Sequence, residues 1–399
     1  MNSHDELLAI KQMVQFNFYK VVEDKDRIRL KIVYRNQKVL TDWIYLNKSD
    51  FDSKRNKLSV LLAKFIKSRS KRDLYELAYI GYDMFKKIDE ELEKQDKDFY
   101  ALDWNIEILN NIKSTKKPIS KVKYTRVLEA NFPPDFSFCL GLMFPREPNK
   151  QEWEEYSTSE LLQLFFDFRF KIINNIDRAE FKKGLYLHEG PLKNGATIKA
   201  IHATNSDLHI SDLEKNALAH DPSVMKYEVE SYNDLIDFWK NKEHPRFILF
   251  STHYSEEVED RFRFTLTHDN FTNHHLVRIG KIPHDQKALL FLNCCKTGNL
   301  PYDGFSNVLT YLYPDYSLGF ITTAFNLRSA DADAFPDRFN RIFMQENMMI
   351  LDAFVKTKNF LVFQSTPPQY AAFGYMLWQV APDLTYAKKS IKRINRKVK

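Results

Sequence analysis

The sequence predicts an α/β protein in which a mostly parallel sheet carries helices on both faces and follows an N-terminal region of strands and helices. In the second half of the chain, short apolar strands alternate with helical segments, which is typical of parallel sheets. In the first quarter, short strands precede two long amphipathic helices. With 44% hydrophobic and 28% charged residues in 399, the composition is that of an ordinary globular protein.

The N-terminal region shows the alternation typical of strands and the three- and four-residue spacing typical of helices. Strands are expected at 15–22, 28–34 and 42–46. The middle strand alternates apolar and charged residues, as a strand with one solvated face does. From about Ser53 the apolar positions recur every three or four residues, first up to Phe65 and again from Leu74 onward. This spacing predicts two amphipathic helices.

The remaining elements follow a polar, basic segment at 112–123, which is the most linker-like part of the chain. The expected strands are 196–201, 247–250, 288–293 and 318–325. The expected helices are 159–175, 211–219, 232–241, 302–313 and 334–357. We therefore divide the chain into an N-terminal region (1–118), a core (119–385) and a basic tail (386–399). The N-terminal region either folds separately or forms part of the core fold.

Two of the buried strands end in reactive side chains. The strand at 247–250 leads into His253, and the strand at 288–292 leads into Cys294 and Cys295. Ligands of open parallel sheets bind beyond the carboxyl ends of the strands. We therefore expect His253 and Cys295 at the same edge, with Cys294 packed on the other side of its strand. A thiol beside an imidazole suits a cysteine nucleophile with a histidine base.

These motifs resemble those of the CHAT peptidases, a caspase-like family related to separases, caspases and gingipains. Family members carry an apolar strand that ends in a Thr-His-Gly turn and another that ends in Ala-Cys-Glu-Thr-Gly. The matching residues here are Ser251-Thr252-His253-Tyr254 and Asn293-Cys294-Cys295-Lys296-Thr297-Gly298. Further segments match in the same order: 202–205, the Glu-containing helix 213–218, 318–340 and 368–373. The resemblance covers roughly residues 195 to 380.

The resemblance implies a caspase-like sheet and a cysteine endopeptidase that works without a cofactor. His253 would be the base and Cys295 the nucleophile, and the backbone N–H groups of Tyr254 and Cys295 would hold the oxyanion. Tyr254 stands where the family usually has glycine, and a bulkier residue with restricted φ there threatens to misplace that N–H.

The same resemblance gives expectations about substrate and control. Phe325 and Asn326 would lie along a bound peptide, while Asp303 and Asp331 are candidates for reading a basic side chain at the cleavage position. Family members commonly serve in regulated proteolysis, including prokaryotic defence and programmed cell death. A protein substrate and a regulatory protein partner are therefore implied. The alternative is an inactive scaffold of the same fold.

The net charge of +6 is a property of the tail. Seven of the twelve residues from Lys388 to Lys399 are Lys or Arg, which leaves the rest of the chain near neutral. A nucleic acid or an acidic partner is therefore expected only through this tail, and a second alternative to the peptidase is an adaptor whose basic tail is the working part.

Membrane, disulfide and metal signals are weak in this sequence. No apolar run is long enough for a membrane span, the N-terminus does not resemble a signal peptide, and three cysteines make a poor disulfide framework. A reducing cytoplasm is thus expected. The clustered histidines have no common zinc spacing, so no metal is expected. They are His268, His274, His275 and His284.

Overall fold

The computed structural model describes most of the chain. The described residues are 14–34, 39–97, 127–133, 136–176, 186–188, 198–208, 210, 212–219, 224–240, 245–255, 262–283, 286–294, 308–309, 311–313, 315–324, 333–381 and 384–387. The linker-like segment 112–123, the basic residues 388–399 and most of the predicted helix 302–313 lie outside them.

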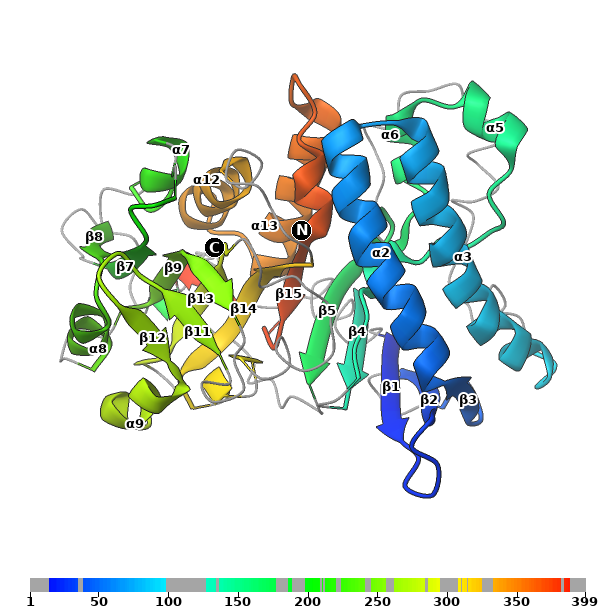
Figure 1. Cartoon of the computed structure of the whole chain (residues 1–399), viewed down its shortest axis with the longest axis horizontal. Coiled ribbons are helices and arrows are strands. Elements are labelled where there is room, and N and C mark those ends of the chain that lie inside the picture. The colour runs from blue at the N-terminus through cyan, green and yellow to red at the C-terminus, as the bar shows by residue number, and fades with distance from the viewer. Residues whose placement is uncertain are drawn as a thin grey trace, which may run out of the picture.

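One large sheet runs through the molecule (Figure 1). Its strands are β1 (Val14–Lys20), β2 (Arg27–Tyr34), β3 (Ile44–Asn47), β4 (Val127–Phe132), β5 (Lys171–Ile176), β7 (Ile198–Thr204), β8 (Val224–Val229), β9 (Phe247–Ser251), β13 (Ala288–Leu292), β14 (Ser317–Thr323) and β15 (Tyr375–Trp378). They lie in the order β3-β2-β1-β4-β5-β15-β14-β13-β9-β7-β8. Only β1–β2, β2–β3 and β14–β15 are antiparallel neighbours, which confirms the mostly parallel sheet.

Smaller elements complete the described structure. The short strands are β6 (Tyr186–His188), β10 (His253–Ser255), β11 (Arg263–Thr265), β12 (Asn270–Thr272) and β16 (Thr385–Ala387). The α-helices outside the N-terminal region are α5 (Lys150–Glu155), α6 (Thr158–Leu162), α7 (Asp212–Lys215), α8 (Tyr232–Lys240), α9 (Leu276–Ile279), α12 (Ala334–Asn340) and α13 (Ile350–Asn359). The 3₁₀ and π segments are η2 (Leu140–Leu142), η3 (Phe166–Phe168), η4 (Asn273–His275), η6 (Arg341–Gln345), η7 (Phe360–Gln364) and η8 (Tyr370–Gly374).

The N-terminal strands belong to the large sheet, because β1 pairs in parallel with β4. Two long helices, α2 (Lys48–Ser68) and α3 (Lys71–Glu93), lie in front of these strands in Figure 1. Each begins at a capping side chain: Asn47 accepts a hydrogen bond from the backbone of Asp50, and Ser70 accepts one from the backbone of Asp73. Such caps stabilise the starts of helices. The observed order of three strands followed by two helices is the order predicted from the sequence.

Helix α3 packs closely against η2 at a glycine. A Cβ atom on Gly81 would lie 2.3 Å from the backbone oxygen of Leu142, closer than real Cβ contacts come. The absence of a side chain at this position therefore allows the helix and the 3₁₀ turn to touch through their backbones.

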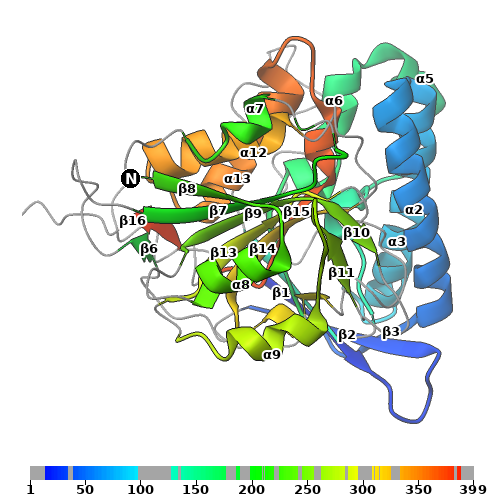
Figure 2. The same ribbon diagram turned by 60° about the vertical axis from the view of Figure 1, so that its left-hand side comes forward.

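Helices cover both faces of the central strands (Figure 2). Helices α7, α12 and α13 lie on one face, and α8 and α9 lie on the other. Every residue of β9, β13 and β14 is buried. Strands covered on both faces read as continuous apolar runs, which is why the sequence revealed them.

The prediction of one helix at 159–175 is wrong. The segment contains α6, then η3, and then β5. Its apolar residues are buried on every side, among them Leu162, Phe165 and Phe168. When most residues of a segment are apolar, the spacing of its apolar residues cannot show whether the segment is a helix or a buried strand.

The predicted helix at 334–357 is interrupted. Helix α12 passes into the π segment η6, and α13 begins only at Ile350. Between them Asn347 has a left-handed φ of 46°. Asparagine is among the residues that tolerate this conformation, and one such residue ends a right-handed helix.

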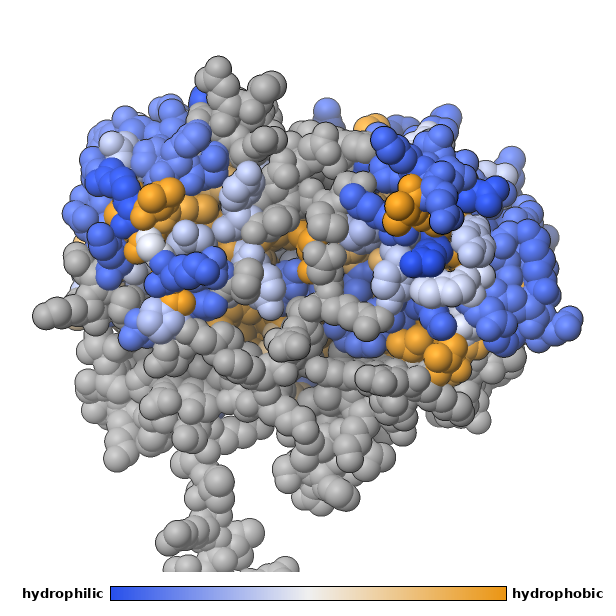
Figure 3. All heavy atoms as spheres, turned by 90° about the horizontal axis from the view of Figure 1, so that it is seen from below, coloured by the Kyte–Doolittle hydropathy of each residue, from blue (hydrophilic) through white to orange (hydrophobic). Residues whose placement is uncertain are grey.

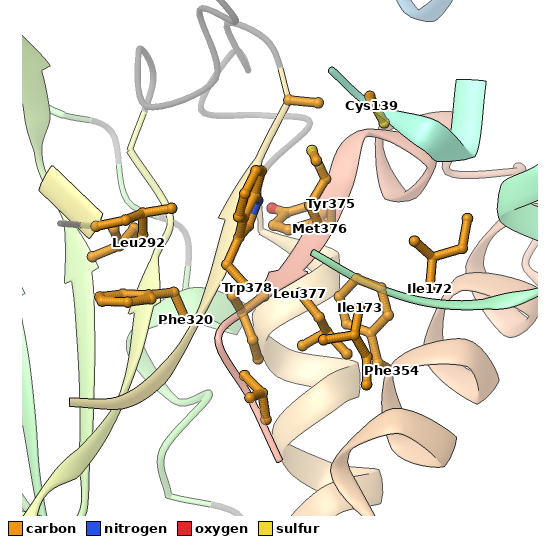
Figure 4. Packing of buried hydrophobic residues seen from close by; sticks show 14 of the residues in the cluster. Cys139, Ile172, Ile173, Leu292, Phe320, Phe354, Tyr375, Met376, Leu377 and Trp378 are labelled. Carbon is orange, nitrogen blue, oxygen red and sulfur yellow. The ribbon is translucent and has the colours of Figure 1, made fainter. Parts of the chain in front are cut away.

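Strand β15 packs at the centre of the core. Figure 4 shows its residues Trp378 and Leu377 between Phe320 of β14 and Ile173 of β5. Trp378 pairs with Phe320 on one side and with Asn174 on the other. This strand therefore joins the N-terminal strands to the central ones.

The described surface mixes polar and apolar residues. Seen from below, apolar residues appear as separate spots among hydrophilic ones (Figure 3). Within the described residues, no helix is long and apolar enough to cross a membrane.

Candidate active site

The chain segments beyond β9 and β13 touch at the carboxyl edge of the sheet. The two strands are parallel neighbours, and past their ends Cys294 Sγ lies 3.5 Å from Thr252 Oγ1. Cys294 is only 1% exposed, in line with the expectation that it packs away from the site. Thr252 and Cys294 directly precede His253 and Cys295 in the sequence. The residues before the predicted base and the predicted nucleophile are therefore in contact.

Most of the predicted site residues lie outside the described residues. These are Cys295, Asp303, Phe325, Asn326 and Asp331. The structure thus places only His253 and Tyr254 of the predicted set.

His253 is exposed and begins β10. This strand forms a small antiparallel sheet with β11 and β12, in which His253 pairs with Thr265. The pairing holds the backbone of the histidine, while its ring remains open to solvent.

The Tyr254 side chain is buried in an aromatic cluster. It is 2% exposed, and its ring lies 5.3 Å from that of Phe264, which in turn stacks on Phe250 of β9 at 4.7 Å. The φ of Tyr254 is not in the left-handed region. The Tyr254 side chain is therefore accommodated by the core without a strained φ.

A buried carboxyl group links β9 to β13 directly behind these residues. Glu214 Oε1 of α7 accepts a hydrogen bond from Ser251 Oγ at 2.5 Å and another from Asn293 Nδ2 at 2.5 Å. Ser251 is the last residue of β9, and Asn293 follows the last residue of β13. One carboxyl oxygen therefore bridges the ends of both strands.

Ser251 and Asn293, which donate these two hydrogen bonds, each have a hydrogen bond to a further side chain. His202 Nε2 of β7 lies 2.8 Å from Ser251 Oγ, and the hydroxyl of Tyr375 donates to Asn293 Oδ1 at 2.7 Å. His202 and Ser251 are 0% and 1% exposed. We call the side chains joined by these four hydrogen bonds the Glu214 network: His202, Ser251, Glu214, Asn293 and Tyr375.

Burial dominates the protonation of this network. The pKa of Glu214 is raised from 4.5 to about 8, mainly by burial and also by the neighbouring Asp333, although the hydrogen bonds from Ser251 and Asn293 oppose the shift. The pKa of His202 is lowered from 6.5 to about 3, again mainly by burial. At pH 7 the carboxyl is therefore mostly protonated and the imidazole is neutral.

Ser251 and His202 are not arranged as a nucleophile and its base. The Ser251 hydroxyl donates its hydrogen to Glu214, so His202 Nε2 must be the donor in the second bond. The hydroxyl is also buried. This pair supports the strand ends and does not attack a substrate.

The described residues contain no group of three or more His, Cys, Asp and Glu side chains arranged to hold a metal ion. His268 lies 3.3 Å from Glu230, and His275 Nδ1 accepts a hydrogen bond from the backbone of Thr272. His284 lies outside the described residues.

The position of Glu214 between the two strand ends was not predicted from the sequence, where this residue is only part of the Glu-containing helix 213–218. A signal was present at the strand ends. Ser251 stands two residues before His253, and Asn293 stands two residues before Cys295. A polar residue that ends a fully buried strand needs a hydrogen-bond partner, and an acid on a neighbouring element is a natural one.

The described site thus belongs to an α/β protein with polar chemistry at the carboxyl edge of its sheet. No family model matches the chain, and no curated protein matches it. Among solved structures it is similar to a chain in two crystal structures of the Saccharomyces cerevisiae separase–securin complex, with 12% identity and TM-scores of 0.45 and 0.42. A structure described as a protease matches with 12% identity and a TM-score of 0.41.

These similarities differ in extent. The two matches to the separase–securin complex cover 96% of this chain but only 31% of the other, so the chain spans about a third of that length. The match to the protease structure covers 66% of this chain and 65% of the other.

Proposed function

We propose that this chain is a cysteine endopeptidase in which Cys295 is the nucleophile and His253 the general base. The contact between Cys294 Sγ and Thr252 Oγ1 at 3.5 Å carries the proposal. Each of these residues is joined by one peptide bond to a proposed catalytic residue, and consecutive Cα atoms are only about 3.8 Å apart. We therefore propose that the side chains of His253 and Cys295 meet at the edge where α/β sheets bind ligands.

The proposed reaction has two halves. His253 accepts the proton of the Cys295 thiol, and the thiolate attacks the substrate carbonyl carbon to form a tetrahedral intermediate. The protonated His253 then gives that proton to the departing amine as the C–N bond breaks, which leaves a thioester on Cys295. Water, deprotonated by His253, attacks the thioester and releases the carboxylic acid and the free thiol.

Described residues support the proposed roles in three respects. His253 is exposed, so it is accessible to solvent and substrate. The strand that it begins is backed by the cluster around Tyr254 and Phe264. The oxyanion would be held by the backbone N–H groups of Tyr254 and Cys295. The negative φ of Tyr254 means that the residue there adopts an ordinary strand conformation.

The substrate class and the regulation come from the motif resemblance alone. We propose a protein substrate that lies along Phe325 and Asn326, with Asp303 or Asp331 selecting a basic residue. We also propose control by a protein partner, in prokaryotic defence or programmed cell death. Cys139 and Cys294 are both buried, and we place the enzyme in a reducing cytoplasm, where cysteine thiols persist.

The test is covalent labelling with a peptide electrophile that carries a basic residue at its reactive end. We expect Cys295 to be modified, as located by peptide mass spectrometry, and the rate to fall by about 10²- to 10⁴-fold in His253→Ala. The matched control is His268→Ala, which removes another exposed histidine.

Three results bear against the proposal. Modification of Cys295 at the rate of a free thiol, unaffected by His253→Ala, would show that the imidazole is not its base. Equal loss in His268→Ala would show an unspecific effect. A protein that folds and binds partners while Cys295 stays unmodified under every condition would be the inactive scaffold.

A further inference from the structure

We propose that Glu214 is a positioning residue that ties the end of β9 to the end of β13 and thereby sets the separation of the proposed base and nucleophile. The inference rests on the proposed function for its catalytic consequence, whereas the tie between the strands stands on the described contacts alone.

The tie acts close to the chemistry. Glu214 Oε1 receives both hydrogen bonds, from Ser251 Oγ and from Asn293 Nδ2, each at 2.5 Å. Ser251 lies two residues before His253, and Asn293 lies two residues before Cys295. A shift of this oxygen would therefore move both segments, whereas a bond within one strand would move only one.

The donors cannot turn away easily, because each is fixed from the opposite side. His202 Nε2 donates to Ser251 Oγ, and the Tyr375 hydroxyl donates to Asn293 Oδ1. The network therefore reaches from β7 through β9 and β13 to β15. A polar network in which each donor is oriented by another group fixes one arrangement of its members.

Strand register explains why the five side chains meet. His202 lies opposite Leu249 in β9, and Leu249 lies opposite Phe291 in β13. Side chains two residues apart in a strand share a face. His202, Ser251 and Asn293 therefore face the same side, where Glu214 of α7 accepts hydrogen bonds from Ser251 and Asn293. Cys294 faces the other side, where it contacts Thr252.

The charges around the network favour a neutral carboxyl group. Burial is the main cause that raises the pKa of Glu214, and the adjacent Asp333, at the start of α12, raises it further. His202 is neutral and is influenced by Lys226 and Glu228 of β8. When Glu214 is neutral, its Oε1 atom accepts the hydrogen bonds from Ser251 and Asn293, and its other carboxyl oxygen carries the proton. Glutamine reproduces this pattern, whereas alanine removes it.

The first arm of the test measures hydrogen exchange in peptides that cover 248–255 and 289–295. The proteins are wild type, Glu214→Ala, Glu214→Gln and the control Asp212→Ala, which removes an exposed acid from the same helix. We expect protection at both strand ends to fall by about 10- to 100-fold in Glu214→Ala, since buried partners are left unsatisfied. Glu214→Gln and Asp212→Ala should keep the wild-type protection from hydrogen exchange at both strand ends.

The second arm measures alkylation of Cys295 by the same peptide electrophile. The rate should fall by about 100-fold in Glu214→Ala, as expected for misplacement by about 1 Å, and should be largely retained in Glu214→Gln. If Glu214→Ala does not fold, Ser251→Ala is the milder variant. It removes the donor on β9 only and should loosen that strand end and slow alkylation.

The outcomes separate the two proposals. Unchanged exchange in Glu214→Ala, or loosening of one strand end only, would overturn the tie. Equal loss in Glu214→Gln would also overturn it, because the acceptor oxygen would then be irrelevant. Loosened ends in a protein whose Cys295 is never alkylated would leave the tie intact and reject the peptidase. Alkylation that depends on His253 but not on Glu214 would reject the positioning role alone.

Discussion

Lys358 Nζ lies 2.5 Å from Asp167 Oδ2, in an ion pair that is almost closed to solvent. The lysine belongs to α13 and the aspartate to η3, and their side chains are 2% and 12% exposed. Burial raises the pKa of Asp167, whereas the charge of Lys358 lowers it. The pair therefore connects α13 to the segment before β5, and each charge depends on the other.

Replacing Lys358 by methionine should destabilise the protein strongly. The change keeps the volume but leaves the Asp167 charge buried without its partner, which costs about 3–5 kcal/mol. Urea unfolding followed by circular dichroism measures the loss. The control is Lys356→Met on the same helix, because Lys356 pairs with Glu346 at the surface and such pairs contribute about 0–1 kcal/mol. Equal losses in the two variants would show that burial of the pair is unimportant.

Gly81→Ala should destabilise the protein although alanine is the better helix former. In an open helix the change would stabilise by roughly 1 kcal/mol. Here the new Cβ would lie 2.3 Å from Leu142 O, so α3 or η2 must move, at a cost of about 1–3 kcal/mol. Thermal unfolding measures the sign. Tyr79→Ala, at an exposed position of α3, controls for changes in helix propensity. A higher melting temperature for Gly81→Ala would contradict the close packing.

Stability should fall with rising pH between about 6.5 and 8 because of Glu214. Its folded pKa of about 8 exceeds the usual 4.5, so its contribution is full below pH 4.5 and is lost as the pH rises to 8. His202, with a pKa lowered from 6.5 to about 3, acts oppositely between pH 3 and 6.5. The two slopes oppose each other between pH 4.5 and 6.5. Above pH 6.5 only Glu214 of these two groups still contributes, with about 1 kcal/mol per pH unit.

Glu214→Gln tests this dependence directly, because the amide does not ionise. Urea unfolding at several pH values should show that the free energy of unfolding of the variant increases relative to that of wild type as the pH rises from 6.5 to 8. Asp212→Asn, at the exposed acid of the same helix, should leave the wild-type slope unchanged. A constant difference between Glu214→Gln and wild type over this range would mean that Glu214 is already ionised at pH 6.5.

The parts of the fold that the sequence predicted well are those with strong local periodicity. The alternation in β2 buries Ile28, Leu30 and Ile32, and the helical spacing in α2 and α3 buries one face of each. The prediction failed where apolar residues are buried on all sides, as in β5. It also missed β15, whose four residues are all buried and carry no alternation.

The candidate site divides in the same way. The strand ends that lead to His253 and Cys295 are visible in the sequence as apolar runs that stop at polar residues. The polar residues Ser251 and Asn293 at these strand ends indicate that a partner is needed, but the sequence does not identify it as Glu214, because the hydrogen bonds join residues 37 and 79 positions apart. Which acid faces a strand end is decided by how α7 packs on the sheet, and no local pattern contains that information.

The position of β15 in the sheet affects the order in which the sheet can form while the chain is being synthesised. In the large sheet β1 to β5 form one contiguous group of strands, and β7, β8, β9, β13 and β14 form another. Among the described strands, only β15 pairs with members of both groups. The group of β1 to β5 leaves the ribosome first, and the second group follows. Residues 375–378 emerge after both, and only then does a hydrogen-bonded strand fill the gap between them. Tyr375, which orients Asn293, belongs to that same strand, so the network behind the candidate site lacks one member until β15 has been synthesised.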